Sequence, residues 1–270
     1  MVEEISSFSN PLVKRIKRLR QKKYRRQEEA FFVEGLRVVL TAVEQGAPLE
    51  SLIYCPELLT SEAAWNMLRR EESGIAQRAV SAAIFESISG RDNPAGLGAI
   101  VRTQWADLDE MTVGPNDIFV ALVETAEPGN LGTILRTMDA VGAKGMILVG
   151  DTVDPFHPSA VKASMGALFS VQIGRTSSSM ALFDWARLHQ LQSVASSARG
   201  NDVYTEANYS SPCLLLLGSE GSGLPAPIMD ACDLTVAIPM AGTASSLNLA
   251  VAAGLLLYEI RRSGSSQATT

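Results

Sequence analysis

The chain has 270 residues, of which 46% are hydrophobic and 19% charged, so it contains enough apolar material for a buried core and is not a disordered or fibrous protein. Its 23 basic and 29 acidic residues give a formal net charge of −6, which by itself argues against a nucleic-acid partner, because phosphate binding depends on positive charge. The three cysteines form no C-x-x-C pair, which excludes a disulfide framework and a four-thiolate zinc site and favours a reducing cytoplasm.

The N-terminal region shows no apolar run of the kind that directs secretion. The longest apolar stretch, at 247–258, is interrupted by Asn248 and is too short to span a bilayer. We therefore expect a cytoplasmic protein with no membrane partner.

The average charge conceals a strongly basic N-terminal segment, at residues 1–30. Between Lys14 and Arg26 the chain carries nine basic residues and no acidic one. The remainder of the chain is therefore more acidic than the average suggests, and the averaged charge is a poor guide to the partner.

Residues 31–104 read as a small α/β domain, because short apolar runs alternate with helical patterns and strands are predicted at 51–55 and 97–102. Residues 105–116 are polar and acidic and contain the turn-forming pair Gly114-Pro115. This composition is typical of an interdomain linker.

Residues 117–262 show a regular alternation of apolar strands and helices, which predicts a mostly parallel sheet covered on both faces. In open sheets of this kind the ligand crevice lies at the carboxyl ends of the strands. The expected strands are 118–124, 145–150, 170–174, 193–197, 213–218 and 234–239, and the expected helices begin near 131 and cover 159–165, 180–191 and 246–261. Residues 263–270 read as a disordered tail.

Several chemistries are disfavoured because their motifs are absent. The two histidines, His157 and His189, lie in no metal-binding spacing, so we expect no metal and ordinary structural roles for both, although His157 sits in a loop that could contact a ligand. The chain has no phosphate-binding loop, no dinucleotide fingerprint and no nucleophile elbow. A small-molecule enzyme of the doubly wound type is therefore disfavoured.

Three loops at strand ends remain as candidate sites. The first, EPGNLGTILRTMDAVG at 127–142, opens a helix that Asn130 could cap, and it carries Arg136 off the apolar face of that helix. Taken alone, Arg136 is an ordinary surface charge.

The second loop, LLLLGSEGSGLP at 214–225, places three glycines around Glu220 at the end of an apolar strand, so its backbone can come close to a ligand. The third, at 236–260, follows a strand and opens an apolar helix at Ser246, with Asn248 in its first turn. Read singly, these loops are a surface turn and a serine-capped core helix.

Together, in this order and spacing, the motifs PGNLGTILRT, LLLLGSEGSGLP and IPMAGTASSLNLAVAAG resemble those of the SpoU (TrmH-like) RNA ribose 2′-O-methyltransferases of the SPOUT superfamily. The resemblance covers the whole chain, and the front part, with FFVEGLRVVLTAVEQG and NPAGLGAIV, is similar to the L30e-like substrate-binding domain of that family. It implies an α/β fold in which a small L30e-like domain at 31–104 precedes a SPOUT domain at 117–262 with a deep trefoil knot, an exception to the unknotted rule.

The resemblance also implies S-adenosylmethionine as the cofactor, held in the knotted loops. By match to the family motifs, its contacts fall on Gly218, Ser219, Ile238, Pro239, Met240 and Leu247. The reaction-site positions fall on Asn130, Arg136, Glu220, Ser246 and Asn248, and all five residue types are present. The third motif departs from many relatives only at Leu249 and Ala250.

The implied reaction is methyl transfer to a ribose 2′-hydroxyl of RNA. This hydroxyl is a weak acid, so the reaction needs in-line positioning and stabilisation of the developing alkoxide. Arg136 would act either as a base assisted by an RNA phosphate or as an electrostatic clamp, since a free guanidinium hardly deprotonates. Asn130 would orient Arg136 or the ribose, and Glu220, Ser246 and Asn248 would hold the loops and the nucleotide.

An RNA substrate would explain the basic segment, whose cations would bind phosphates and whose Tyr24 could stack on a base. The alternative is that this segment is an ordinary solvated basic helix. Its expected phosphate contacts are Lys14, Arg15, Lys17, Arg18, Arg20, Lys22, Lys23, Arg25 and Arg26.

The L30e-like domain favours large-subunit ribosomal RNA as the substrate, with transfer RNA as the alternative. A catalytically silent RNA-binding or ribosome-assembly factor on the same fold is the alternative outside the enzyme class. The resemblance further implies a homodimer in which Arg136 of one subunit serves near the cofactor pocket of its partner.

Overall fold

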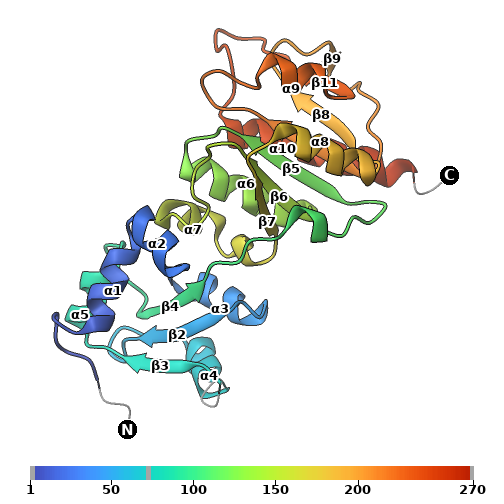
Figure 1. Ribbon diagram of the computed structural model, residues 1–270. Coiled ribbons are helices and arrows are strands. Elements are labelled where there is room, and N and C mark those ends of the chain that lie inside the picture. The colour runs from blue at the N-terminus through green and yellow to red at the C-terminus, as the bar shows by residue number, and fades with distance from the viewer. Residues whose placement is uncertain (1–3, 71–73, 268–270) are drawn as a thin grey trace. The chain divides into compact units, whose positions relative to one another are not determined.

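The computed structural model describes residues 4–70 and 74–267, which divide into two compact units. The first unit contains the chain up to Gln104 together with Asp154–Ser170, and the second contains Trp105–Val153 and the chain from Val171 onward. Figure 1 labels most elements of both. The segment Asp154–Ser170, which the sequence analysis placed in the C-terminal domain, therefore packs with the N-terminal one.

The first unit is built on a four-stranded sheet of order β1-β4-β2-β3. Strand β4 is antiparallel to β1 and β2, whereas β2 and β3 are parallel. The strands are β1 (Ala30–Glu34), β2 (Leu49–Tyr54), β3 (Ala76–Ala79) and β4 (Leu97–Arg102), and the helices are α1 (Pro11–Leu19), α2 (Lys22–Glu28), α3 (Leu36–Glu44), α4 (Glu62–Arg70), α5 (Ala82–Ile88), α7 (Pro158–Ser164) and the short 3-10 helix η3 (Ala167–Phe169). The strands expected at 51–55 and 97–102 are confirmed.

Helix α1 shows why the basic segment folds as it does. The side chain of Asn10 accepts a hydrogen bond from the backbone N–H of Leu12, and Pro11 occupies the first helical position. The apolar residues Val13, Ile16 and Leu19 recur every three residues and are buried, so most of the intervening basic side chains face outward.

The second unit is a seven-stranded sheet of order β7-β6-β5-β10-β8-β11-β9, in which every pair of neighbours is parallel. The strands are β5 (Ile118–Val123), β6 (Gly145–Val149), β7 (Gln172–Thr176), β8 (Gln192–Ser196), β9 (Asp202–Val203), β10 (Cys213–Leu217) and β11 (Leu234–Ala237), and the helices are η2 (Leu108–Glu110), α6 (Pro128–Val141), α8 (Ser179–Leu188), α9 (Ala226–Asp230) and α10 (Leu249–Gln267). This confirms the expected α/β fold with a mostly parallel sheet.

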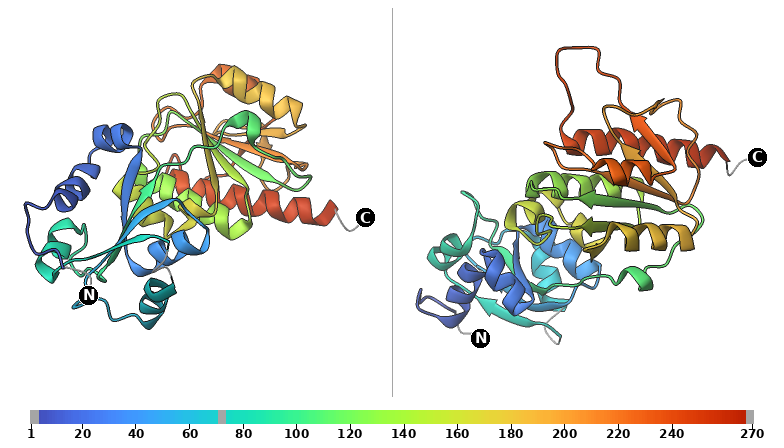
Figure 2. Two further views of the ribbon diagram at one scale, coloured as in Figure 1. Left: turned by 60° about the horizontal axis from the view of Figure 1, so that its bottom comes forward. Right: turned by 45° about the horizontal axis from the view of Figure 1, so that its top comes forward.

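Helices cover both faces of this sheet, as Figure 2 shows. The side chains of Leu182 and Trp185 from α8 are buried in one core with Phe119 and Ala121 of β5. The Phe119 and Trp185 rings meet edge to face, with centroids 5.1 Å apart. The alternating residues of β5 are buried as well, so this strand is covered on both sides.

Three details differ from the sequence predictions. The stretch expected to be a linker, 105–116, packs on its own unit: Ala106 forms a parallel bridge with Gly174, and Met111 is only 2% exposed. The last helix begins at Leu249 rather than Ser246 and continues to Gln267, past the start of the expected disordered tail, of which 268–270 lie outside the described residues.

Within the described ranges, no helix has the length and apolarity needed to cross a membrane.

Candidate functional site

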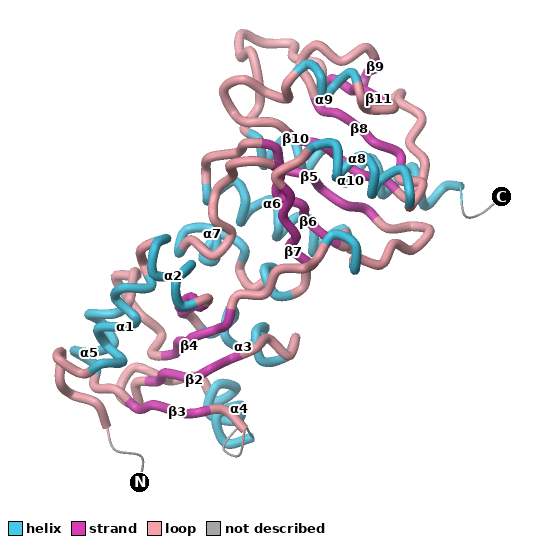
Figure 3. The backbone as a smooth tube through the Cα atoms, viewed as in Figure 1, coloured by secondary structure: helices cyan, strands magenta, loops and turns pink. Residues whose placement is uncertain are grey.

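A pocket of about 630 Å³ lies within the second unit, at the carboxyl ends of three parallel strands. Three loops line it: Ser196–Arg199 after β8, Leu217–Ala226 after β10, and part of 238–249 after β11. Figure 3 draws these loops in pink beyond the ends of the strands. A parallel sheet brings the ends of its strands to one edge, which is where a ligand crevice is expected.

The second and third sequence motifs therefore meet at one pocket. Gly218, Ser219, Ile238, Met240 and Leu247 line it, as expected of cofactor contacts, whereas Pro239 does not. Of the expected reaction-site residues, Glu220 and Ser246 line the pocket, and the other three do not.

The sequence analysis missed the loop after β8. Its pocket-lining residues are small except for Arg199, and Gly200 lies so close to the strand β11 that a Cβ there would come within 2.4 Å of the carbonyl carbon of Val236. The run SSARG directly after an apolar strand is the signal that could have indicated it.

The glycine-rich loop after β10 folds back on itself. The backbone N–H of Gly223 donates to the carbonyl oxygen of Ser219 at 3.0 Å, and the hydroxyls of Ser219 and Ser222 lie 2.7 Å apart. A Cβ on Gly218 would lie 2.1 Å from the carbonyl carbon of Gly223. Position 218 therefore tolerates only glycine if this turn is to close.

A chain of hydrogen bonds joins the three motifs. Asn130, in the first turn of α6, donates from Nδ2 to Oε1 of Glu220 at 2.8 Å and accepts at Oδ1 from Nδ2 of Asn248 at 2.9 Å. Asn130 is thus the third residue of its helix rather than the N-cap, a position held by Glu127. Three of the residues expected at the reaction site, from distant parts of the sequence, are therefore held together.

Asn248 has a second function in this network. Its Oδ1 accepts from the backbone N–H groups of Ala250 and Val251 at 2.9 and 3.3 Å, so Asn248, and not Ser246, caps α10. Residues 241–248 are all exposed, and the loop between β11 and α10 projects away from the sheet in Figure 2 (right).

Arg136 and Ser246 stand apart from this network. Arg136 is exposed on α6, does not line the pocket, and has no hydrogen-bond partner among the residues that the structure describes. Its guanidinium is therefore free to interact with a partner molecule.

The two cysteines of the second unit, Cys213 and Cys232, carry protons at neutral pH. Burial raises the pKa of Cys213 to about 12 and that of Cys232 to about 12. Neither thiol supplies a thiolate nucleophile under ordinary conditions. In the described parts of the chain, no three His, Cys, Asp or Glu side chains gather as metal ligands would.

The basic segment presents most, but not all, of its charge to solvent. Lys14, Lys17, Arg18, Arg20, Lys22, Lys23 and Arg26 are exposed. Arg15 is partly covered and forms ion pairs of 2.7 Å with Glu28 and with Glu50. Arg25, expected to contact phosphate, is instead 2% exposed and paired with Asp154, because its position on α2 faces the core of the unit.

Tyr24 of the basic segment and the two histidines of the chain each contact other side chains or backbone groups. The guanidinium of Arg18 lies over the ring of Tyr24, 4.2 Å from its centroid, so one face of the ring is already occupied. His157 is the N-cap of α7, where its Nδ1 accepts from the N–H of Ser159 at 3.1 Å, and the ring of His189 packs 5.4 Å from that of Trp185. Both histidines therefore have structural contacts.

Residues 117–258 match the SpoU rRNA methylase family, and residues 10–99 match the MRM3-like substrate binding domain. A Streptomyces viridochromogenes 23S rRNA (uridine(2479)-2′-O)-methyltransferase is 34% identical, over 86% of this chain and 82% of that protein. A Bacillus subtilis 23S rRNA (guanosine(2553)-2′-O)-methyltransferase is 27% identical, over 96% of this chain and its full length.

Solved structures agree with these matches. The crystal structure of an AdoMet-bound rRNA methyltransferase from Sinorhizobium meliloti is 37% identical and has a TM-score of 0.88, covering 97% of this chain and 98% of that one. The family match spans the site described above, from β5 to α10. The chain therefore belongs to the SpoU rRNA methylase family.

Proposed function

We propose that the protein transfers the methyl group of S-adenosylmethionine to a ribose 2′-hydroxyl in large-subunit ribosomal RNA. The hydrogen-bonded chain of Asn130, Glu220 and Asn248 carries this proposal, because it joins the three family motifs beside the pocket. The named relatives support the substrate class, since they modify 23S rRNA at a uridine or a guanosine. They differ in the nucleotide, so the proposal is for the ribose and not for one base.

The pocket fits S-adenosylmethionine. Its volume of about 630 Å³ lies in the range of cofactor sites, and its lining combines backbone groups of a glycine-rich turn with apolar side chains. Gly218 and Ser219 would offer backbone contacts, while Ile238, Met240 and Leu247 would contact the apolar parts. When bound, this cofactor supplies an electrophilic methyl group on a sulfonium.

The side chains of the protein would position and stabilise the ribose oxygen. We assign Arg136 the role of an electrostatic clamp on the developing alkoxide, because a guanidinium retains its proton at any ordinary pH. Asn130, Glu220 and Asn248 would fix the geometry of the loops around the nucleotide, and the exposed Ser246 would reach the RNA from the third loop.

We further propose a homodimer formed through α10. Val251, Leu255 and Tyr258 lie four and three residues apart, on one side of this helix, and are 52%, 39% and 60% exposed. A stripe of large apolar side chains on an otherwise well-packed helix is a typical protein interface. A second copy would cover it, and Arg136, which does not line the pocket of its own chain, would then serve the pocket of the partner.

The dimer is tested by sedimentation of the wild type and of Tyr258→Asp. We expect a dimer at micromolar concentration for the wild type and a monomer for the variant, with loss of methyl transfer. A monomeric wild-type protein would disprove the shared site.

We also infer a cytoplasmic location, which the family resemblance supports. We infer as well a knotted C-terminal chain, which is supported by the family resemblance and by the closeness of the loops after β10 and β11.

The reaction is tested by transfer of a labelled methyl group to large-subunit RNA, small-subunit RNA and transfer RNA, each from a strain that lacks the gene. We expect label in the large-subunit RNA, with a loss of at least about 100-fold in Arg136→Ala. The control is Arg187→Ala, which removes another exposed arginine, on α8. Label in transfer RNA alone would move the substrate to that class, and cofactor binding without label in any RNA would favour a silent assembly factor.

A further inference from the structure

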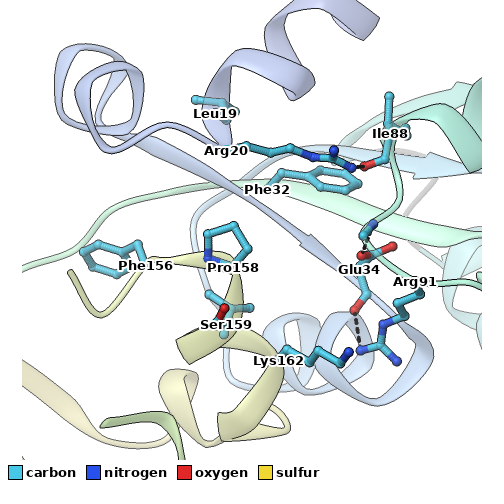
Figure 4. A pocket seen from close by; sticks show the side chains of 12 residues that line it. Leu19, Arg20, Phe32, Glu34, Ile88, Arg91, Phe156, Pro158, Ser159 and Lys162 are labelled. Carbon is cyan, nitrogen blue, oxygen red and sulfur yellow. Dashed lines mark hydrogen bonds between the residues drawn. The ribbon is translucent and has the colours of Figure 1, made fainter. Parts of the chain in front are cut away.

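A second pocket, of about 200 Å³, lies within the first unit and is not part of the site described above. Four segments form it: the end of α1, strand β1, the residues that follow α5, and the start of α7. Figure 4 shows their side chains converging on one space.

The pocket has an aromatic wall. The ring of Phe32 is only partly buried and lies against Gly98 of β4, where a Cβ would come within 2.6 Å of the ring. The absence of a side chain at Gly98 is therefore what lets the ring occupy this position. Phe156 and Pro158 add apolar surface on the opposite side in Figure 4.

One fixed carboxylate faces the pocket. Glu34 accepts at Oε1 from the backbone N–H of Gly90 at 2.8 Å and at Oε2 from the hydroxyl of Ser89 at 2.5 Å. These two donors hold the group in place and leave each oxygen with a lone pair for a further donor. Both donors are uncharged groups.

Three cationic side chains also line the pocket. Arg20 donates from Nη2 to the carbonyl oxygens of Ile88 and Ser89, at 2.9 and 2.6 Å. Arg91 makes only a long contact of 3.4 Å from Nη2 to the carbonyl oxygen of Glu34, and its buried Nε has no partner among the described residues. The exposed Lys162 points toward Arg91 in Figure 4.

An aromatic wall, an acceptor and a cluster of cations match three features of a nucleotide: the face of its base, an amino group on that base, and its phosphate. Unpaired bases stack on aromatic rings, exocyclic amino groups donate to carboxylates, and phosphates bind arginine and lysine. The volume suits one base and excludes a duplex. We propose that this pocket binds a single unpaired nucleotide that bears an exocyclic amino group, with its base between Phe32 and Glu34 and its phosphate on Arg91 and Lys162.

This inference rests on the proposed function for the source of the nucleotide, which we take to be the substrate RNA. A pocket selective for adenine, cytosine or guanine over uracil would give the first unit sequence preference beyond the attraction of its basic helices. Uracil carries a carbonyl oxygen where cytosine carries the amino group, and this oxygen would face the carboxylate of Glu34.

The test measures binding of heptamers of A, C and U, and of AMP, to the full-length protein without S-adenosylmethionine. We expect the A and C heptamers to bind about 10-fold more tightly than the U heptamer, and AMP to bind far more weakly than the A heptamer. Equal affinity for A, C and U would overturn the proposal. AMP binding as tight as that of the heptamer would overturn RNA as the source.

Two variants locate the binding. Phe32→Leu keeps an apolar side chain but removes the ring, and is expected to lose about 10-fold for A and C with little change for U. Lys162→Met is expected to reduce the slope of log affinity against log salt by about 0.7, the value for one phosphate contact on a single strand. The matched control is Lys144→Met, which removes an exposed lysine of the second unit.

Unchanged affinity and slope in both variants, with a wild-type melting temperature, would disprove the pocket as the binding site. This outcome is separable from failure of the proposed function. Heptamer binding is scored without cofactor, whereas failure of the proposed function appears as the absence of methyl transfer by the wild-type protein.

Discussion

Arg25 and Asp154, which are 129 residues apart in the sequence, form an ion pair with two hydrogen bonds to one carboxylate oxygen. Nε and Nη2 of Arg25 donate to Oδ2 of Asp154 at 2.9 and 2.7 Å, and Nη1 donates to the carbonyl oxygens of Leu19 and Arg20. Asp154 begins the segment that leaves the second unit of the chain and packs with the first. The ion pair thus fastens the basic helices to this segment.

Replacement of Arg25 by Met is expected to lower the free energy of unfolding of the first unit by about 3–5 kcal/mol, because it leaves a carboxylate and two carbonyl groups without their donor. The control Arg26→Met removes the neighbouring exposed charge and is expected to change stability by less than about 0.5 kcal/mol. Urea denaturation of both variants measures this difference. If both variants were equally stable, the ion pair would have no structural role.

His157 is expected to make the first unit less stable as the pH falls. Burial, followed by the charge of Arg25, lowers the pKa of His157 below its ordinary value, so the unfolded chain takes up a proton at a higher pH than the folded one. The contribution of neutral His157 to the stability of the folded unit is therefore fully present above the ordinary histidine pKa. It decreases as the pH falls from there toward the lower pKa that His157 has in the folded protein. Protonation also removes the Nδ1 acceptor that caps α7.

His157→Asn keeps a capping acceptor that does not titrate in this range. We expect the wild type to lose about 1 kcal/mol more than this variant between pH 7 and pH 5, the size of one helix cap. Urea denaturation at the two pH values gives the comparison. Parallel losses in both proteins would show that His157 does not contribute to the pH dependence.

Gly218→Ala is expected to abolish cofactor binding. The added methyl group would overlap the backbone of Gly223, at 2.1 Å, so the turn that lines the pocket must open. Gly221→Ala is the control, since Gly221 lies in the same turn but has no atom within 4 Å of its added Cβ. Calorimetric titration with S-adenosylmethionine should show loss of binding in the first variant only, and equal affinities would contradict the role of this close approach.

Asn248→Asp separates the two functions of this residue. An aspartate still caps α10, so stability should change by less than about 0.5 kcal/mol, but it cannot donate to Asn130. We expect methyl transfer to fall by about 10-fold to 100-fold, because the link between the first and third motifs is lost. Asn248→Ala should lose about 1 kcal/mol of stability in addition. Full activity in Asn248→Asp would show that the cap alone matters.

The sequence predicted six of the strands of the second unit, most of which contain a short apolar run such as CLLLL at 213–217. It missed the two-residue strand β9, Asp-Val at 202–203, which is too short to form such a run. It also predicted two of the three loops that line the pocket, on which Gly218 and Leu247 lie, and missed the loop after β8. The strand β3, AQRA, was missed because its burial is too irregular to give an alternating pattern. The role of Asn248 as a cap was missed because Ser246 is an equally good capping residue in the sequence.

The sequence by itself determined which residues are apolar, where the turns fall and which family the motifs resemble, since all of these are local properties of the chain. Only the tertiary structure decided that Arg25 is buried while Arg26 is exposed, that Asp154–Ser170 packs with the N-terminal unit, and that Arg91 and Lys162 share a pocket with Arg20. These are contacts between residues far apart in the chain, and no local pattern carries information about which distant segment will cover a given side chain.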